Sequence, residues 1–432
     1  MIKLLLLFAL IQPGDTLTED KVIELALEHN FDIRLEKYNL KVAENNNTIG
    51  NAGMLPTVGV SGSGRQSIQD TEQQFISGEG QSRDGAKTTV YTAGASLDWT
   101  LFDGFRMFAT KDRLEEISQL NQMAFKNQVQ DAISDVLKSF YNTALEQDRL
   151  ALLESTLKLS EERVTISKEK YEVGKASKLE YLQAQVDYNS DQSALVKQQE
   201  VIAIQKLQLL HLIGVQEGYD SFTLAYTHDT SDKLKDLANI ESDAIQQNPM
   251  LKQLRSQQEV NILTIKENER ERLPTLDFNL GYNYSNLTAE AGFLQSNVSS
   301  GITYGLTATM TLFDGLNRNR TIQNAKILSE QSFTAYEQGE AQLRTAVRSG
   351  LMTLRNAQIL ADLEQKNLEV AEENVSIALE RYRVGKSNPI EVREAQNNAV
   401  NAQIRYIEAL NTTKIAEIEL LRLSGNLLGS RE

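Results

Sequence analysis

The sequence predicts a mainly α-helical fold in which long coiled-coil helices are combined with four β-strands per chain. Three observations support this prediction: the chain repeats itself, each repeat has a stretch of more than sixty residues without proline, and each repeat has segments of strict apolar–polar alternation. The 432 residues include only five prolines, against a usual share of about one in twenty. Long uninterrupted helices are therefore expected.

The repeat is visible as an ordered series of short motifs. Three motifs occur twice in the same order: Leu-Phe-Asp-Gly (101–104 and 312–315), Tyr-x-Val-Gly-Lys (171–175 and 382–386) and Leu-Pro-Thr (55–57 and 273–275). The first two pairs lie 211 positions apart and the third 218, so the repeats differ by seven residues in one loop. A fixed spacing of this kind indicates a tandem duplication.

The duplication divides the chain into five parts. These are a leader (1–15), a first repeat (16–214), a linker (215–236), a second repeat (237–425) and a tail (426–432). The leader has one early lysine and an apolar run, Leu4–Ile11, that is too short to span a bilayer. This pattern predicts a secretory signal, with a disordered or trimmed leader as the alternative.

Each repeat opens with a helical segment and continues with a β-hairpin. The helical segments, about 18–54 and 237–272, are expected to end before Pro56 and Pro274, because proline disfavours helix in the residue before it. Alternation predicts hairpins at about 57–102 and 275–313, with polar loops at about 65–86 and 285–299. Four strands cannot close a barrel, which needs about eight, so the strands form a small sheet or several chains pool them. Three chains would supply twelve.

A very long helix follows each hairpin. The stretches 105–171 and 316–382 contain no proline, and at 1.5 Å per residue each would extend roughly 100 Å. We expect Asp103 and Asp314 to cap these helices, with Gly104 and Gly315 easing the bend. Turns at Gly174 and Gly385 lead into second helices of about 36 residues. Such helices are expected to pack side by side as coiled coils.

Composition argues against several classes of function. A formal charge of −15 argues against a nucleic-acid partner. The chain has no cysteine and only three scattered histidines, and we find no phosphate loop and no nucleophile paired with a base. We therefore predict no catalytic residues, no metal site, no cofactor and no enzymatic activity.

The duplicated layout resembles the TolC-type outer-membrane efflux proteins. The resemblance rests on the strand pairs ending in Leu-Phe-Asp-Gly and on Tyr-x-Val-Gly followed by Ala-Gln, and it covers 18–425. It implies a homotrimer whose twelve strands form one barrel in the lipid of the outer membrane, above a periplasmic helical tunnel with a belt at mid-height. It also implies a passive exit duct for efflux or type I secretion, which an adaptor protein and an inner-membrane pump open. The cargo, whether drug, metal or protein, is left open.

The resemblance also suggests a gate at the periplasmic end of the tunnel. It implies that Glu391 and Glu394 form rings of carboxylates in the closed mouth, and that Tyr382 is tied to Glu180 of the other repeat. For Glu391 and Glu180 the residues support a second interpretation, because Asn388-Pro389-Ile390-Glu391 and Ser177-Lys178-Leu179-Glu180 both read as helix-capping boxes. The alternative interpretation of Tyr382 is an aromatic side chain that only packs against its neighbours.

The two turns are the predicted docking site for the adaptor. The residues concerned are Val173, Gly174 and Lys175 in the first repeat, and Val384, Gly385 and Lys386 in the second. The simpler interpretation is helix termination by a left-handed glycine with a lysine at the helix end, and both interpretations can hold together. The remaining alternative for the whole chain is a coiled-coil structural or adhesion protein without a channel, although such a rod does not need the hairpins.

Overall fold

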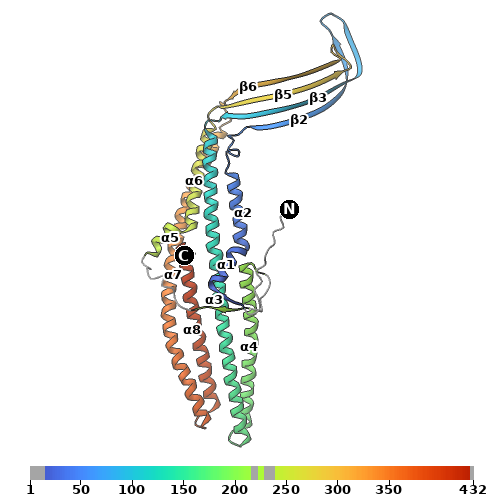
Figure 1. Cartoon of the computed structure of the whole chain (residues 1–432). Helices are drawn as coiled ribbons and strands as arrows, with labels where there is room; N and C mark the ends of the chain where they lie inside the picture. The colour runs from blue at the N-terminus through green and yellow to red at the C-terminus, as the bar shows by residue number, and fades with distance from the viewer. Residues whose placement is uncertain (1–14, 216–221, 228–238, 429–432) are drawn as a thin grey trace. The chain divides into compact units, whose positions relative to one another are not determined.

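The computed structural model describes residues 15–215, 222–227 and 239–428 (Figure 1). It confirms a mainly helical chain with one larger sheet. The elements are β1 (Asp15–Thr18), α1 (Glu19–His29), α2 (Phe31–Asn46), β2 (Thr57–Gln74), β3 (Gly80–Phe102), α3 (Arg106–Glu172), α4 (Lys178–Ile213), β4 (Phe222–Ala225), α5 (Ile240–Gln247), α6 (Pro249–Arg270), β5 (Thr275–Ala289), β6 (Ser296–Thr309), α7 (Asn317–Arg383) and α8 (Pro389–Leu423). Most of the leader, linker and tail lies outside the described residues.

The chain folds as two compact units, each assembled from both repeats. One unit comprises 1–39, 122–253 and 336–432, and the other comprises 40–121 and 254–335. The long helices α3 and α7 each contribute to both units. Among the described residues, no helix is both long enough and apolar enough to cross a membrane.

The four long strands form one antiparallel sheet in the order β2-β3-β5-β6. Each repeat supplies one hairpin, and β3 pairs with β5 to join them, with Leu97 opposite Leu280. Strands β2 and β3 extend through most of 65–86, which the sequence predicted as a loop. Polar cross-strand pairs accompany this extension: the side-chain amide of Gln66, for example, donates to the Thr89 hydroxyl at 3.3 Å. Apolar alternation cannot detect such pairs.

The helical segment before each hairpin is interrupted by an asparagine. Asn30 separates α1 from α2, and Asn248 separates α5 from α6. Each side-chain carbonyl accepts the backbone N–H three residues on. Each side-chain amide donates to a carbonyl in the last turn of the long helix that ends the same repeat, Leu212 (2.7 Å) in α4 or Leu423 (3.0 Å) in α8. The asparagines thus attach α2 to the end of α4, and α6 to the end of α8.

The helix α2 ends at Asn46, ten residues before Pro56. The amide of Asn51 donates to the carbonyl of Asn46 at 2.9 Å and satisfies one of the free carbonyls at the helix end. Pro56 and Pro274 instead stand directly before strands β2 and β5. Proline is tolerated at the start of a strand because its missing N–H removes no hydrogen bond from the ladder.

The strand-to-helix corners are built alike in the two repeats. The carboxylate of Asp103 accepts the N–H of Met107 at 3.1 Å, and that of Asp314 accepts the N–H of Arg318 at 2.8 Å. The glycine after each aspartate has a positive φ, and so does the next residue, Phe105 or Leu316, with φ of 66° in each case. Two successive left-handed residues turn the chain sharply from strand to helix.

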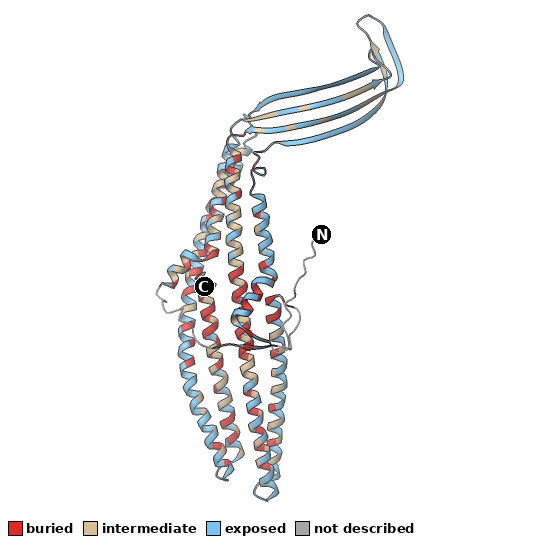
Figure 2. Ribbon diagram, in the orientation of Figure 1, coloured by how far each residue is buried: buried red, intermediate tan, exposed pale blue. Residues whose placement is uncertain are grey.

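A hydrophobic core lies where α1, α4 and a small parallel ladder of β1 and β4 pack against the middle of α3 (Figure 2). Phe140, Tyr141, Leu209 and Phe222 are at most 2% exposed. Asp15, at the end of the predicted leader, pairs with Phe222 in this ladder. The linker therefore contributes a strand, β4, to the core of this unit, which the sequence analysis did not predict.

Candidate functional site at the helix turns

The turns α3–α4 and α7–α8 have the same backbone design. In each, the N–H of the lysine after the glycine donates back to the carbonyl five residues earlier, at 2.7 Å for Lys175 and 2.8 Å for Lys386. Gly174 and Gly385 both have φ of +74°, and a Cβ at either would meet no atom within 4 Å. These glycines are therefore required by the left-handed backbone and not by crowding.

The turns expose apolar side chains at their tips. Val173 is 68% exposed and Val384 is 66% exposed. Each directly precedes its glycine, and both line one cleft of about 920 Å³ between the turns. An exposed valine beside a backbone that carries no side chain is a surface that another apolar group can approach closely.

The two acidic residues after the second turn have different surroundings. Glu391 accepts hydrogen bonds from the Ser387 hydroxyl at 2.5 Å and from the Asn388 side-chain amide at 3.1 Å. Asn388 in turn accepts the N–H of Glu391 at 3.0 Å, which completes the N-cap of α8. Glu394 is exposed and makes no hydrogen bond or ion pair with any described residue. Only Glu394 thus keeps its carboxylate fully available to solvent.

Tyr382 is buried, and Glu180 lies near it without a hydrogen bond between them. The tyrosine is 2% exposed and packs against Ala378, Val392 and Ala395. Its hydroxyl has no hydrogen-bond partner in the part of the chain that the structure describes. Burial raises the pKa of Tyr382, and the negative charge of Glu180 raises it further.

Lys170 is a member of this site that the sequence analysis missed. Its ammonium group lies 3.6 Å from the centroid of the Tyr382 ring and donates to the Tyr382 carbonyl at 2.5 Å. Burial lowers the pKa of Lys170, while Glu180 acts in the opposite direction. The cation joins α3 of the first repeat to α7 of the second, at the level where the resemblance suggested a tie through Glu180.

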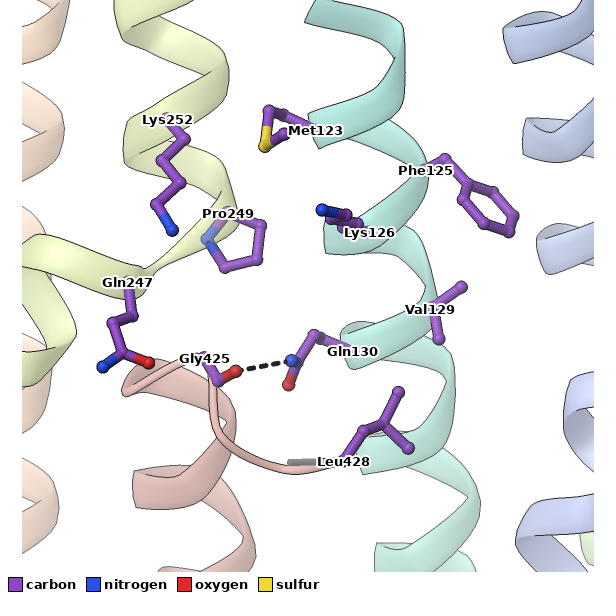
Figure 3. Close-up of a pocket in the computed structure, with 10 residues that line it drawn as sticks. All are labelled: Met123, Phe125, Lys126, Val129, Gln130, Gln247, Pro249, Lys252, Gly425 and Leu428. Atoms are coloured by element: carbon purple, nitrogen blue, oxygen red, sulfur yellow. Dashed lines mark hydrogen bonds between the residues drawn. The ribbon is translucent and has the colours of Figure 1, made fainter. Parts of the chain in front are cut away.

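A second pocket, of about 460 Å³, lies where α3 passes the α5–α6 junction and the end of α8 (Figure 3). Here Gln130 of the first repeat donates from its side-chain amide to the carbonyl of Gly425 in the second, at 2.9 Å. The position related to Gln130 by the repeat is Ala341, which has no amide. The hydrogen bond from Gln130 therefore has no amide donor at its repeat-related position.

Ion pairs join the two repeats along α3 within each unit. Among the described residues, pairs that connect α3 to α6 or α8 include Arg113–Glu267 (2.6 Å), Lys138–Glu419 (2.5 Å), Asp131–Arg422 (2.7 Å) and Arg149–Glu408. No sequence motif marks them, because each partner lies more than 150 residues from the other. We call this set of contacts the internal seam.

Comparisons with known proteins agree with this architecture. The family model for outer membrane efflux proteins matches residues 22–215 and 241–426, that is, both repeats. Among curated relatives, the probable efflux pump outer membrane protein TtgC of Pseudomonas putida is 22% identical over 94% of this chain and 82% of its own length. Protein CyaE of Bordetella pertussis is 23% identical over 96% of this chain and 85% of its own.

Solved structures give the same result for the fold. The outer membrane protein VceC of Vibrio cholerae superimposes with a TM-score of 0.76, at 16% identity, over 94% of this chain and 96% of that one. The CmeC outer membrane channel of Campylobacter jejuni has a TM-score of 0.76 at 17% identity, over 96% of this chain and 87% of that one.

Proposed function

Because the chain belongs to the outer membrane efflux protein family, we propose that it is a passive exit duct in the outer membrane, assembled from three copies. Its periplasmic end is gated at the α3–α4 and α7–α8 turns, and an adaptor protein together with an inner-membrane pump opens it. Relatives described as an efflux pump component and as the proteases secretion protein PrtF of Dickeya chrysanthemi support either efflux or type I secretion. No enzymatic activity is proposed.

The sheet supports an assembly of several copies. Its outermost strands, β2 and β6, each have one neighbour, so each leaves a long row of backbone N–H and C=O groups unpaired. Apolar side chains such as Val60 (86% exposed) and Tyr304 (77%) project from these strands. Joining β6 of one copy to β2 of the next pairs these groups, and three copies give twelve strands, enough to close a barrel in lipid.

The repeat itself indicates which helix faces meet between copies, and this is the observation that carries the proposal. Within the chain, α3 packs against α6 and α8, so the equivalent contact would join α7 to α2 and α4. In the single chain those faces are open: Leu35, Tyr38 and Val42 on α2 and Met352, Leu360 and Leu363 on α7 are each at least half exposed. A second copy would cover both faces, and we call this contact the external seam.

The strand-to-helix corners support the same pairing. A Cβ at Gly104 would lie 2.5 Å from the Cβ of Leu273 in the other repeat, so the glycine permits a close contact. The equivalents of these residues are Gly315 and Leu55. Gly315 meets only its neighbour Asn317, and Leu55 is 51% exposed. The same close contact would form between copies.

The gate and the docking surface complete the proposal. Glu394, which pairs with no described residue, and Glu391, held by its cap, would form acidic rings around the mouth. Behind it, the contact of Lys170 with Tyr382 joins the two repeats, and Glu180 lies near both. Rings of carboxylates attract cations and repel anions. The exposed Val173 and Val384 beside Gly174 and Gly385 would receive the adaptor, with Lys175 and Lys386 at the rim.

The proposal is tested by the mass and the conductance of the detergent-extracted particle. Three chains of 48.4 kDa give a particle of about 145 kDa, which should conduct ions after reconstitution into a planar bilayer. A monomer or dimer that stays in solution without detergent would contradict the duct, and would leave the coiled-coil structural protein as the better account.

A further inference from the structure

The sheet has one open edge on each of its two outer strands (Figure 1). The strands that carry these edges differ in length: β2 has 18 residues and β6 has 14. In a barrel the edge of β6 must fit the edge of β2 in the next copy. A shift of even one residue between the two would turn every side chain to the wrong face, so the register decides whether the barrel can close.

The pairing of β3 with β5 inside the chain provides the register expected between copies. By the repeat, β6 corresponds to β3 at an offset of 211, and β2 corresponds to β5 at an offset of 218. Asp98 lies opposite Asn279. The repeat-related residues are Thr309 and Ser61, so the same geometry places Thr309 opposite Ser61 of the next copy. The antiparallel ladder then continues one residue at a time to Ser296, opposite Gln74.

This register brings the ends of the two strands together. Ser296 is the first residue of β6, and Gln74 is the last residue of β2. The register follows from Asp98 and Asn279, near the helix end of the sheet, so the agreement at the far end is an independent observation. It also gives a reason for the length of β2, because residues 65–74 provide the next copy's β6 with a partner over its full length.

The register also matches the side chains on both faces of the sheet. On the polar face, threonines of β6 fall opposite serines of β2: Thr309 and Ser61, Thr307 and Ser63, and Thr303 and Ser67. Such pairs form cross-strand hydrogen bonds, as the hydroxyls of Ser63 and Thr92 do at 2.7 Å inside the chain. On the apolar face Ile302 falls opposite Ile68, and in the single chain these side chains are 69% and 61% exposed.

The helix end of β6 is incomplete in the single chain. Its counterpart β3 continues to Phe102, and its last residues pair with β5, for example Trp99 with Phe278. The repeat-related segment 310–313 keeps the apolar–polar alternation but is not a strand. Leu312 is 88% exposed, against 42% for its equivalent Leu101. In the register above, this segment lies opposite 58–60 of the next copy.

We propose that β6 of one copy pairs with β2 of the next in this register, and that residues 58–60 of the next copy convert 310–313 into the last part of β6. We call this contact the barrel seam, and the inference rests on the proposed trimeric duct. Backbone N–H and C=O groups that enter lipid must be hydrogen-bonded, and the partner copy supplies the groups that 310–313 needs. The barrel seam therefore forms a strand end that one chain cannot form alone.

The register is tested with pairs of introduced thiols, since the chain has no cysteine. The first variant carries Thr307→Cys with Ser63→Cys, which are opposite each other in the proposed register. Two matched variants keep Thr307→Cys and place the second thiol two residues away on the same face, as Ser61→Cys or Arg65→Cys. In one chain β2 and β6 are opposite edges of the sheet, so a disulfide between them joins two copies.

Each variant is extracted from membranes in detergent, its particle mass is measured, and it is oxidised with copper phenanthroline. Opposite residues of paired strands have Cα atoms about 4.5 to 5.5 Å apart, within disulfide range, whereas diagonal neighbours are about 7 to 8 Å apart. Non-reducing electrophoresis should therefore show covalent multimers at least about fivefold faster for the first variant than for either matched variant. Ile302→Cys with Ile68→Cys should react equally fast on the other face.

Hydrogen exchange tests the completed end of β6. In the assembled particle the backbone amides of 310–313 should exchange at least about tenfold more slowly than unpaired amides of the same sequence. Their protection should be similar to that of 99–102, which are paired inside the chain.

The results that would overturn the inference differ in what else they exclude. Faster cross-linking of either matched variant would show a register shifted by two residues, and the trimeric duct would still stand. Unprotected amides at 310–313 in a cross-linked particle would show that the partner copy does not complete β6. A particle with the mass of a trimer that no thiol pair cross-links would exclude the barrel seam. A monomeric particle would exclude the trimeric duct itself.

Discussion

The internal seam and the proposed external seam involve equivalent positions of the two repeats, yet the residues at these positions differ in chemistry. The internal seam carries four ion pairs between α3 and α6 or α8. Their repeat-related positions are Asn324 and Ile49, Ser349 and Gln208, Gln342 and His211, and Leu360 and Lys197. No combination there pairs a carboxylate with a lysine or an arginine.

This difference shows how a duplicated chain can separate folding from assembly. Charged pairs need defined partners, so they specify contacts inside the chain, where both partners are always present. Apolar faces are less selective and can be covered later by another copy. The repeat supplies the common geometry, and divergence after duplication gives each seam its own chemistry.

The largest effect is expected from placing a charge in each seam. Leu152 is 6% exposed on α3, and its repeat-related residue Leu363 is 51% exposed on α7. Leu152→Asp should cost about 4 kcal/mol of folding free energy, because it buries an unpaired carboxylate. Leu363→Asp should leave the folded chain intact but weaken association by about 2 kcal/mol per seam.

Denaturant unfolding and the mass of the detergent-extracted particle measure these two effects. Helical content lost at lower denaturant identifies a folding defect, whereas folded monomers identify an assembly defect. Equal loss of folding in both variants would show that the face of α7 is already covered within the chain.

Valine substitutions at the two corner glycines form the next comparison. Gly104→Val should cost about 3 kcal/mol, since φ is +74° and a Cβ would lie 2.5 Å from Leu273. Gly315→Val adds only the backbone strain, about 1 to 2 kcal/mol, in the separate chain, but it should block assembly if Leu55 of another copy packs there. Thermal unfolding of each variant measures the loss of stability, and the mass of the detergent-extracted particle measures assembly. Normal multimers of the Gly315 variant would contradict the corner contact.

Acid should weaken the internal seam through Glu419. Burial by itself would raise the pKa of this carboxyl, but hydrogen bonds from Arg422 and Lys138 outweigh it and lower the pKa to about 2. A carboxyl with a depressed pKa stabilises the fold fully above its unfolded pKa of about 4.5 and loses this contribution as the pH falls toward 2.

The loss should amount to about 2 to 3 kcal/mol between pH 4.5 and 2. Stability measured against pH for the protein and for Glu419→Gln gives this difference directly, because the variant lacks the titrating group. Parallel curves for the two proteins over this range would show that Glu419 does not contribute.

The smallest effects on stability are expected at the mouth. Glu391→Ala should cost about 1 kcal/mol, because Glu391 completes the cap of α8, whereas Glu394→Ala should leave stability unchanged. In bilayer recordings, both substitutions together should weaken the block of ion current by divalent cations. Unchanged block in the double variant would remove the acidic rings from the account of the gate.

Local patterns in the sequence predicted the duplication, the order of hairpin and long helices in each repeat, and the positions of the helix turns. These predictions rest on local properties: glycine at left-handed positions, alternation along strands and the absence of proline. Each can be recognised without knowledge of the tertiary contacts. The capping role of Glu391 was predictable for the same reason, because the pattern 388–391 lies within four consecutive residues.

Tertiary structure alone decided the contacts between the repeats. Asn30 and Asn248, Lys170 against Tyr382, and the polar contacts of Arg163 join segments that are 24 to more than 200 residues apart. An isolated arginine or asparagine on a helix has no sequence signal for its partner, since the partner is set by how the two repeats dock. The physical reason is that periodicity encodes which face of a helix is apolar, whereas the identity of a buried ion pair depends on three-dimensional neighbours.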